Sequence, residues 1–265
     1  MPSSDTPLAK TRPELLKMCL KSRFLDFPLL SLFTFIFLIP LLVWIIFSNY
    51  VLVEQITPEN YFFMGLLIYL PYIPLGMIFG LGVSGALNFA KRLSFQEGAN
   101  VINDFFHGIA KNIGMNLLTF FLIFFFYALL KLSSLLLVHL LDNIAATILI
   151  GVMYAGFFII LMIFFFILTQ TILYKGSFWQ LFVNGVRFLV GMFGWNLLIF
   201  LIVLLPFLVY EFVPFTIAQY IAIAISLLFY FGFSIFVFTL YSHSLFDLTI
   251  NQDYPEIYRK GLSKE

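Results

Sequence analysis

The residues that could carry out chemistry in this chain are few and scattered. The chain has three histidines, at His107, His139 and His243. Their spacing is not that of metal ligands, and the sequence contains no phosphate-binding loop and no zinc-protease motif. Lys131 beside Ser133 and Ser134 could supply a base and a nucleophile, but this grouping is more typical of a polar turn. The sequence therefore predicts no catalytic residue, no metal site and no cofactor.

Neutral polar residues gather near one end of the apolar segments. The candidates are Asn88, Asn116, Gln170, Asn196 and His243. In one interpretation they form hydrogen bonds between helices and cap helix ends, and in the other they line an inward-facing polar vestibule that suits a pore or a binding site. Asn116 and Asn196 occupy equivalent first turns of two apolar segments, which favours the structural role.

Long apolar segments are the elements that must position these residues. Of the residues, 62% are hydrophobic and 10% charged, against roughly 25% charged in a soluble domain. Uncharged runs extend over residues 27–53, 61–90, 113–130, 143–174, 189–210 and 212–246. Each run is long enough for a membrane-spanning helix, which needs about 20 apolar residues. We expect an all-α polytopic membrane protein with six transmembrane helices in one membrane domain, residues 1–265.

A repeated motif divides the chain into three units. Possible helix-capping boxes begin at Thr11, Ser94 and Ser177, each 83 residues after the one before. An amphipathic stretch and two apolar runs follow each box, so we expect three parallel helical hairpins, each preceded by an amphipathic cytoplasmic helix. The units are about 11–93, 94–176 and 177–252, and a cytoplasmic tail follows at 253–265.

Small residues recur at four-residue spacing on the second, fourth and sixth apolar runs. The candidate packing residues are Gly76, Gly80, Ser84, Gly151, Ala155 and Ala222. Small side chains let two helices approach closely, so these positions predict packing seams within one bundle. A homo-oligomer interface is the alternative.

The basic residues indicate an orientation. Apart from Lys131, every lysine and arginine falls before, between or after the hairpins on one side of the predicted membrane. The excess of positive charge on cytoplasmic segments then places both termini in the cytoplasm. Cys19, the single cysteine, lies in the N-terminal segment, and its two interpretations are an apolar helix position or a palmitoylated juxtamembrane residue.

No ionisable residue falls near the middle of an apolar run, and we expect Lys131 and Glu211 to lie on the outer side. Because proton- and ion-coupled transporters keep ionisable groups inside the membrane, this pattern argues against a coupled pump.

The segment GLGVSGALNFAKRLSFQEGANVINDFFHGIAKN, residues 80–112, resembles the YesL-like family of bacterial membrane proteins. The likeness rests on Glu97-Gly98, on Asp104-Phe105-Phe106 and on Lys111-Asn112, and residues 174–188 resemble the second cytoplasmic turn of that family. The outer segment 54–60 and the tail depart from the pattern. The resemblance implies a bacterial plasma membrane and a link to carbohydrate use, without catalytic residues.

Three classes of function remain open. The sequence favours an accessory or scaffold component of a bacterial membrane system, whose partners are the lipid bilayer and a membrane protein or a second copy of the chain. A small-solute transporter or channel that is not coupled to ions is the alternative. An intramembrane enzyme fits least, and nothing indicates binding of nucleic acid.

Overall fold

The computed structural model describes residues 8–111, 113–141 and 143–263, and these ranges contain helices and turns but no strand. The α-helices are α1 (Arg12–Ser22), α2 (Asp26–Phe47), α3 (Tyr61–Tyr69), α4 (Tyr72–Ser94), α5 (Val101–Lys111), α6 (Ile113–Leu140), α7 (Asn143–Thr171), α8 (Phe178–Gly191), α9 (Phe193–Val203), α10 (Leu205–Phe212), α11 (Thr216–Ile225) and α12 (Phe231–Leu248). The short π-helical segments are η1 (Ser48–Leu52) and η3 (Ser226–Tyr230), and the 3-10 turns are η2 (Val53–Gln55) and η4 (Asn251–Asp253).

Within the described ranges, five helical stretches are long and apolar enough to cross a membrane. They are Asp26–Gln55, Tyr61–Ser94, Ile113–Leu140, Asn143–Thr171 and Thr216–Leu248. The pair α8 and α9 adds a sixth only if it counts as one bent span. The chain is therefore an all-helical membrane protein with five or six candidate spanning segments, where the sequence predicts six.

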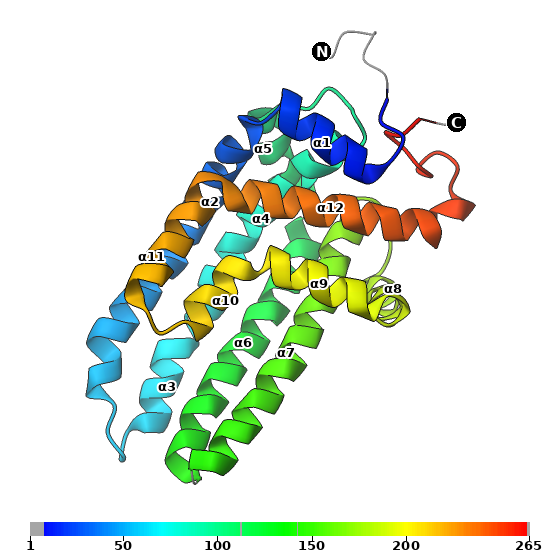
Figure 1. Cartoon of the computed structure of the whole chain (residues 1–265). Coiled ribbons are helices and arrows are strands. Elements are labelled where there is room, and N and C mark those ends of the chain that lie inside the picture. The colour runs from blue at the N-terminus through cyan, green and yellow to red at the C-terminus, as the bar shows by residue number, and fades with distance from the viewer. Residues whose placement is uncertain (1–7, 112, 142, 264–265) are drawn as a thin grey trace.

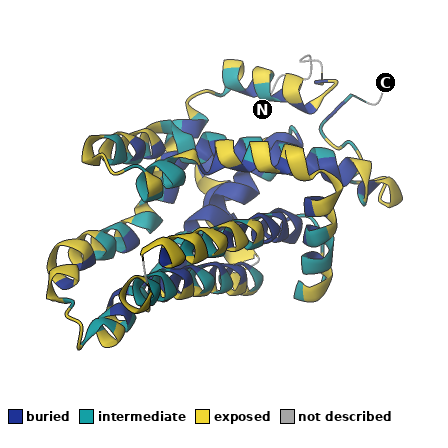
Figure 2. Cartoon of the chain, turned by 60° about the horizontal axis from the view of Figure 1, so that its bottom comes forward, coloured by how far each residue is buried: buried dark blue, intermediate teal, exposed yellow. Residues whose placement is uncertain are grey.

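The first four long segments lie side by side as a bundle (Figure 1). α4 packs against α2 and α6, and α7 packs against α6. Two glycines permit the close approach of α4 and α6, since a Cβ atom at Gly76 or Gly80 would collide with the ring of Phe124 or Phe120. Buried residues accordingly gather on α4, whereas the neighbouring helices expose their outer faces (Figure 2).

The third unit does not repeat this hairpin. The predicted span 189–210 is divided among three helices, and α8 meets α9 at 104°. Met192 leaves helical geometry at this corner, with φ −139° and ψ 44°. The side chain of Asn196 donates to the carbonyl oxygens of Phe188 and Leu189, at 2.8 Å and 3.0 Å, and so satisfies two acceptors that the ended helix leaves without amide partners.

α12 lies across one end of the bundle, because the chain changes direction at η3 between α11 and α12 (Figure 1). A close backbone contact joins α12 to α2. A Cβ atom at Gly232 would collide with the backbone of Phe27, and the Gly232 amide donates to the hydroxyl of Ser31 at 2.8 Å. Because glycine has no side chain at position 232, α12 can cross α2 at this short distance.

Two of the three predicted capping motifs do cap a helix. The Thr11 hydroxyl accepts from the Glu14 amide at the start of α1. Ser177 and Gln180 form the reciprocal bonds of a capping box at the start of α8. These two boxes begin helices as the sequence predicts.

The prediction for Ser94 is wrong, because Ser94 is the last residue of α4. The next helix, α5, follows Asn100, whose side chain accepts from the Asn103 amide at 3.0 Å. The apolar face of α5 packs against α4, with Gly108 against Asn88. The equal spacing of the motifs therefore does not give three equal helix starts.

Burial determines the reactivity of Cys19, which is 5% exposed on α1. Burial raises the pKa of its thiol to about 11. Because the thiolate is the reactive form, we expect maleimide to alkylate Cys19 in the folded protein at least roughly 100-fold more slowly than a free thiol near neutral pH. The rate should rise with pH, and denatured protein should react fully. Rapid stoichiometric labelling, measured by intact mass, would contradict this placement of α1 and restore the palmitoylation hypothesis.

Candidate functional site

The sequence leaves two interpretations open for the five polar candidates, interhelical hydrogen bonds or an inward-facing vestibule, and in the structure all five form hydrogen bonds between helices. Asn88 donates to the carbonyl oxygen of Asp104 at 2.8 Å, which ties α4 to α5. Gln170 donates to the carbonyl oxygen of Leu181 at 3.1 Å, which ties α7 to α8. Neither of the two cavities described below is lined by Asn88, Asn116, Gln170, Asn196 or His243.

The other polar candidates have the same kind of partner. Asn116 accepts from the hydroxyl of Thr171 at 3.0 Å and so links α6 to α7. Asn196 accepts from the hydroxyl of Tyr241 at 2.7 Å, in addition to supporting the corner between α8 and α9. These contacts are interhelical hydrogen bonds and a helix-end support, which is the structural interpretation of the polar residues.

The small residues on the three runs lie in different environments. Gly76 and Gly80 lie at the contact between α4 and α6, and Ser84 is buried one turn further along. Gly151 and Ala155 are exposed on α7, and nothing lies within 4 Å of a Cβ atom built on Gly151. The predicted packing seam is therefore absent at these two positions within the described chain. The Ala222 side chain is buried and lines a cavity.

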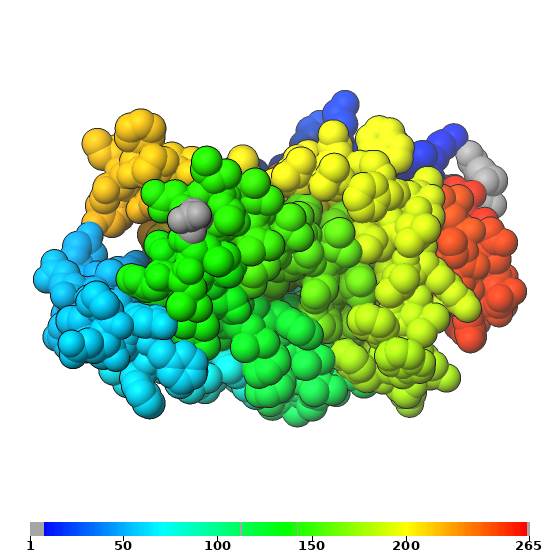
Figure 3. Space-filling view, turned by 90° about the horizontal axis from the view of Figure 1, so that it is seen from below, coloured from blue at the N-terminus to red at the C-terminus, as the bar shows by residue number. Residues whose placement is uncertain are grey.

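This cavity has a volume of about 230 Å³ and lies between α2, α4, α6, the α9–α10 break and η3. Its walls are almost entirely aliphatic and aromatic side chains. The polar exceptions are the hydroxyl-bearing residues Tyr72, Tyr127, Tyr210, Ser226, Tyr230 and Ser234. The end of the molecule away from the two termini is hollowed between α11 and the ends of α3 and α6, which are coloured orange, cyan and green in Figure 3. Concave apolar sites with a few polar groups are the usual form of a small-molecule site.

Two irregular helix segments form one side of the cavity. Leu204, at the break between α9 and α10, lines it, as does Pro206, which has no amide to continue the helical bonding. Tyr230 ends the π-helical segment η3, and its hydroxyl donates to the carbonyl oxygen of Ile202. Both π-helical turns and broken membrane helices recur at functional sites.

A buried ion pair adjoins this cavity. Lys131 Nζ lies 2.6 Å from Glu211 Oε1, and only 5% of the Glu211 side chain is exposed. The Tyr127 hydroxyl, on a cavity-lining residue, donates to Glu211 Oε2 at 3.0 Å, and the Tyr154 hydroxyl donates to Oε1. The carboxylate thus has three donors from two helices.

Sequence reasoning missed this pair because it assigned Lys131 and Glu211 to the outer side separately. In the structure Lys131 lies nine residues before the end of α6 at Leu140, or about 13 Å along the helix axis. Ionisable groups inside a membrane are costly unless they are paired. One feature of the sequence does point to an ion pair at Lys131. It is the sole basic residue outside the basic segments, so it needs an acidic partner on the same side.

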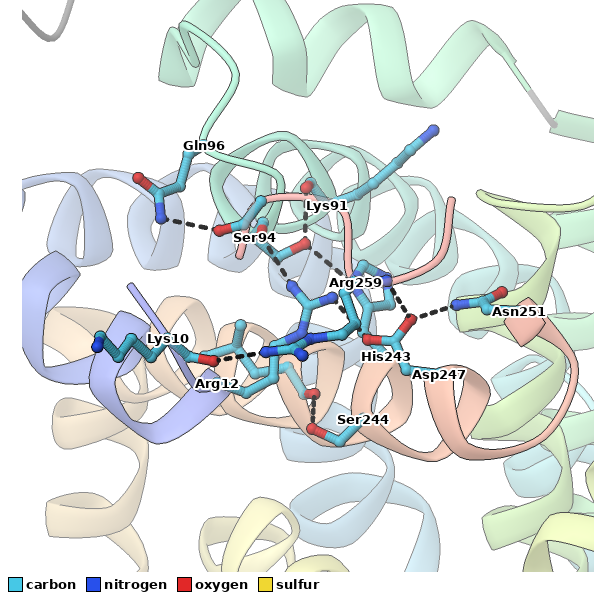
Figure 4. A network of polar contacts seen from close by, with 12 residues as sticks. Lys10, Arg12, Lys91, Ser94, Gln96, His243, Ser244, Asp247, Asn251 and Arg259 are labelled. Carbon is cyan, nitrogen blue, oxygen red and sulfur yellow. Dashed lines mark hydrogen bonds and ion pairs between the residues drawn. The ribbon is translucent and has the colours of Figure 1, made fainter. Parts of the chain in front are cut away.

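A second ionic network lies at the end of the molecule that carries both termini (Figure 4). Arg12, which is 5% exposed, donates to Asp247 Oδ2 at 2.9 Å and to the carbonyl oxygen of Ser94 at 3.0 Å. Burial lowers the pKa of the Arg12 guanidinium, while the bond to Asp247 opposes that effect, and the group stays a cation. Arg12 therefore joins α1, α4 and α12.

The C-terminal segment extends this network. Asp247 Oδ1 accepts from the side chain of Asn251 at 2.7 Å and from the Arg259 amide at 3.1 Å. The Ser263 amide donates to the carbonyl oxygen of Ala9 at 2.9 Å. The two ends of the described chain are therefore held together.

Ser94, His243 and Asp247 do not form a hydrolytic triad. The Ser94 hydroxyl is 2.9 Å from His243 Nδ1, whereas His243 Nε2 is buried and has no hydrogen-bond partner among the described residues. The Asp247 carboxylate is bound by Arg12 and the tail, and His243 is 1% exposed. A triad requires a carboxylate that orients the imidazole and a serine that a substrate can reach. The cluster is suited to holding segments together.

The described residues contain no group of three or more histidine, cysteine, aspartate or glutamate side chains that could hold a metal ion. Comparison of the chain with models of protein families, with curated proteins and with solved structures gives no match.

Proposed function

We propose that this membrane protein binds a small apolar or amphipathic molecule in the cavity beside η3 and acts as a solute carrier or receptor without a catalytic step. The cavity of about 230 Å³ carries this proposal, because it is apolar and lies beside the break between α9 and α10 and the π-helical segment η3. A regular helix exposes only side chains, whereas an interrupted helix can rearrange around a ligand. The sequence favours an accessory role over a transporter, and the proposal made here takes the opposite order.

Pairing of the buried charges supports a carrier that is not coupled to ions. Glu211 is bound by Lys131, Tyr127 and Tyr154, and Asp247 by Arg12. A group that moves a proton must exchange between protonated and ionised forms, and close cationic partners oppose protonation of a carboxylate.

An accessory role in a bacterial membrane system linked to carbohydrate use is the second candidate, and the resemblance to the YesL-like family supports it. The specific observation is the outward face of α5, which exposes Ile102 and Phe106 while the opposite face packs against α4. The exposed small residues Gly151 and Ala155 on α7 suit contact with a second copy or another membrane helix.

The proposed topology has six crossings, with both termini in the cytoplasm of a bacterial cell. The contact between Ala9 and Ser263 supports an even number of crossings. The bent pair α8 and α9 then counts as the fifth crossing. The basic residues near the termini support the cytoplasmic assignment.

Filling the cavity should prevent binding. We expect Ala222→Phe to abolish labelling of cavity residues, such as Leu204, by a diazirine-bearing alkanol, because the added ring occupies the apolar space. The measurement is photocrosslinking of purified protein in nanodiscs, with adducts mapped by mass spectrometry.

Ala155→Phe is the matched control, since Ala155 is exposed on α7, and it should leave the cavity adducts unchanged. Both variants are compared at equal monodispersity in size-exclusion chromatography. Adducts confined to outward-facing residues of the wild type, or cavity adducts retained at full yield in Ala222→Phe, would refute the binding proposal.

The orientation is testable with one introduced cysteine. Glu59 is exposed in the turn before α3, so Glu59→Cys should react with an impermeant maleimide outside intact cells. Native Cys19 is buried and provides a low background. Labelling that appears only after lysis would show that this turn faces the cytoplasm and that the proposed orientation is inverted.

A further inference from the structure

Five helix ends converge around a second cavity of about 230 Å³. The lining residues come from the last turn of α4, the end of α5, the first turn of α6 and the connection between α7 and α8. Three of them are lysines: Lys91, Lys111 and Lys175. No aspartate or glutamate lines the cavity.

These lysines have no acidic partner in the described part of the chain, where no carboxylate lies within ion-pair distance of any of them. Glu97, the acidic residue whose field acts on Lys91, is already bound by Lys260 at 2.8 Å and lies 3.5 Å from Arg92. Three cationic groups therefore surround one cavity without local neutralisation.

Lys91 is held in a fixed position. Its Nζ donates to the carbonyl oxygen of Ile172 at 3.0 Å, which uses one of the three ammonium donors and leaves two for another acceptor. Figure 4 shows its side chain extending away from the network around Arg12 and Asp247. Lys111 and Lys175 are exposed, and each can turn toward the cavity.

Helix starts and helix ends both lie beside the cavity. Met115 in the first turn of α6 and Gly176 just before α8 both line the cavity, so the amino-terminal ends of two helices lie beside it. Helix starts carry partial positive charge and unpaired amides that favour anions. The carboxyl-terminal ends of α4, α5 and α7 oppose this effect, so the lysine side chains supply the positive charge of the site. Lys91 binds the carbonyl oxygen of Ile172, just after α7.

We propose that this lysine cavity binds a phosphate-bearing anion, either the headgroup of an anionic phospholipid or a soluble phosphate. A phosphoryl group offers several acceptor oxygens to several lysines at once. Met115, Ile172 and Leu181 also line the cavity, and their apolar side chains can contact the ester part of such a molecule. The site is separate from the apolar cavity beside η3 and does not depend on its function.

Lys111→Gln/Lys175→Gln tests the proposal, with Lys17→Gln/Lys21→Gln as the matched control. The control removes the same charge from exposed lysines of α1 that do not line the cavity. Purified proteins are placed in phosphatidylcholine nanodiscs with and without phosphatidylglycerol, and retained phosphatidylglycerol is counted by native mass spectrometry. Inorganic phosphate is added to the phosphatidylcholine discs in a parallel titration followed by thermal unfolding.

A lipid headgroup is supported if the wild type and the control retain phosphatidylglycerol and the cavity variant binds it roughly 30-fold more weakly. A stabilising shift with inorganic phosphate that the cavity variant alone loses identifies a soluble phosphate. Equal loss in both double variants, or no binding in either arm, overturns the proposal. Lys111→Arg/Lys175→Arg keeps the charges, should bind nearly as the wild type does, and separates loss of the site from loss of folding.

Discussion

A guanidinium that leaves water must be paired, and this requirement on Arg12 organises one end of the molecule. Its bonds to Asp247 and to the carbonyl oxygen of Ser94 join the first helix, the last helix and the end of α4. The cost of burying two ions is large, so the pair specifies which segments meet and adds little net stability over an apolar contact. The C-terminal segment then contacts the N-terminal one, because the Arg259 side chain donates to the carbonyl oxygen of Lys10 and the Ser263 amide to that of Ala9.

The same requirement accounts for the other polar side chains. Asn88, Asn116, Gln170 and Asn196 each bond a neighbouring helix or a helix end, because an unpaired amide in apolar surroundings is unfavourable. Glu211 and Lys131 follow the same rule near the far end. The polar groups are thus used for assembly, and two cavities among the described residues differ in lining, since one is apolar and the other carries three lysines.

Apolar run length predicted the first four spanning segments well, since only a helix satisfies the backbone over such lengths. The fifth run is not one straight helix, and hydropathy could not predict its corner because Met192 is as apolar as the helical residues around it. The side chain of Asn196 stabilises the bend. The prediction that Ser94 caps a helix was wrong because a capping motif is short and occurs by chance. In the structure the hydroxyl of Ser94 is hydrogen-bonded to His243 instead. The pairs Arg12–Asp247 and Lys131–Glu211 join residues far apart in sequence, and spacing cannot reveal them.

Arg12 and Asp247 hold the first and last helices together through a direct contact. A double-mutant cycle with Arg12→Met, Asp247→Asn and the combined variant measures this contact through equilibrium unfolding in mixed detergent micelles. Each single change should cost about 3–5 kcal/mol, because it leaves the other charge buried without a partner. The combined variant should be less destabilised than the sum of the two by about 2 kcal/mol or more. Additive losses, with a coupling energy near zero, would contradict the account.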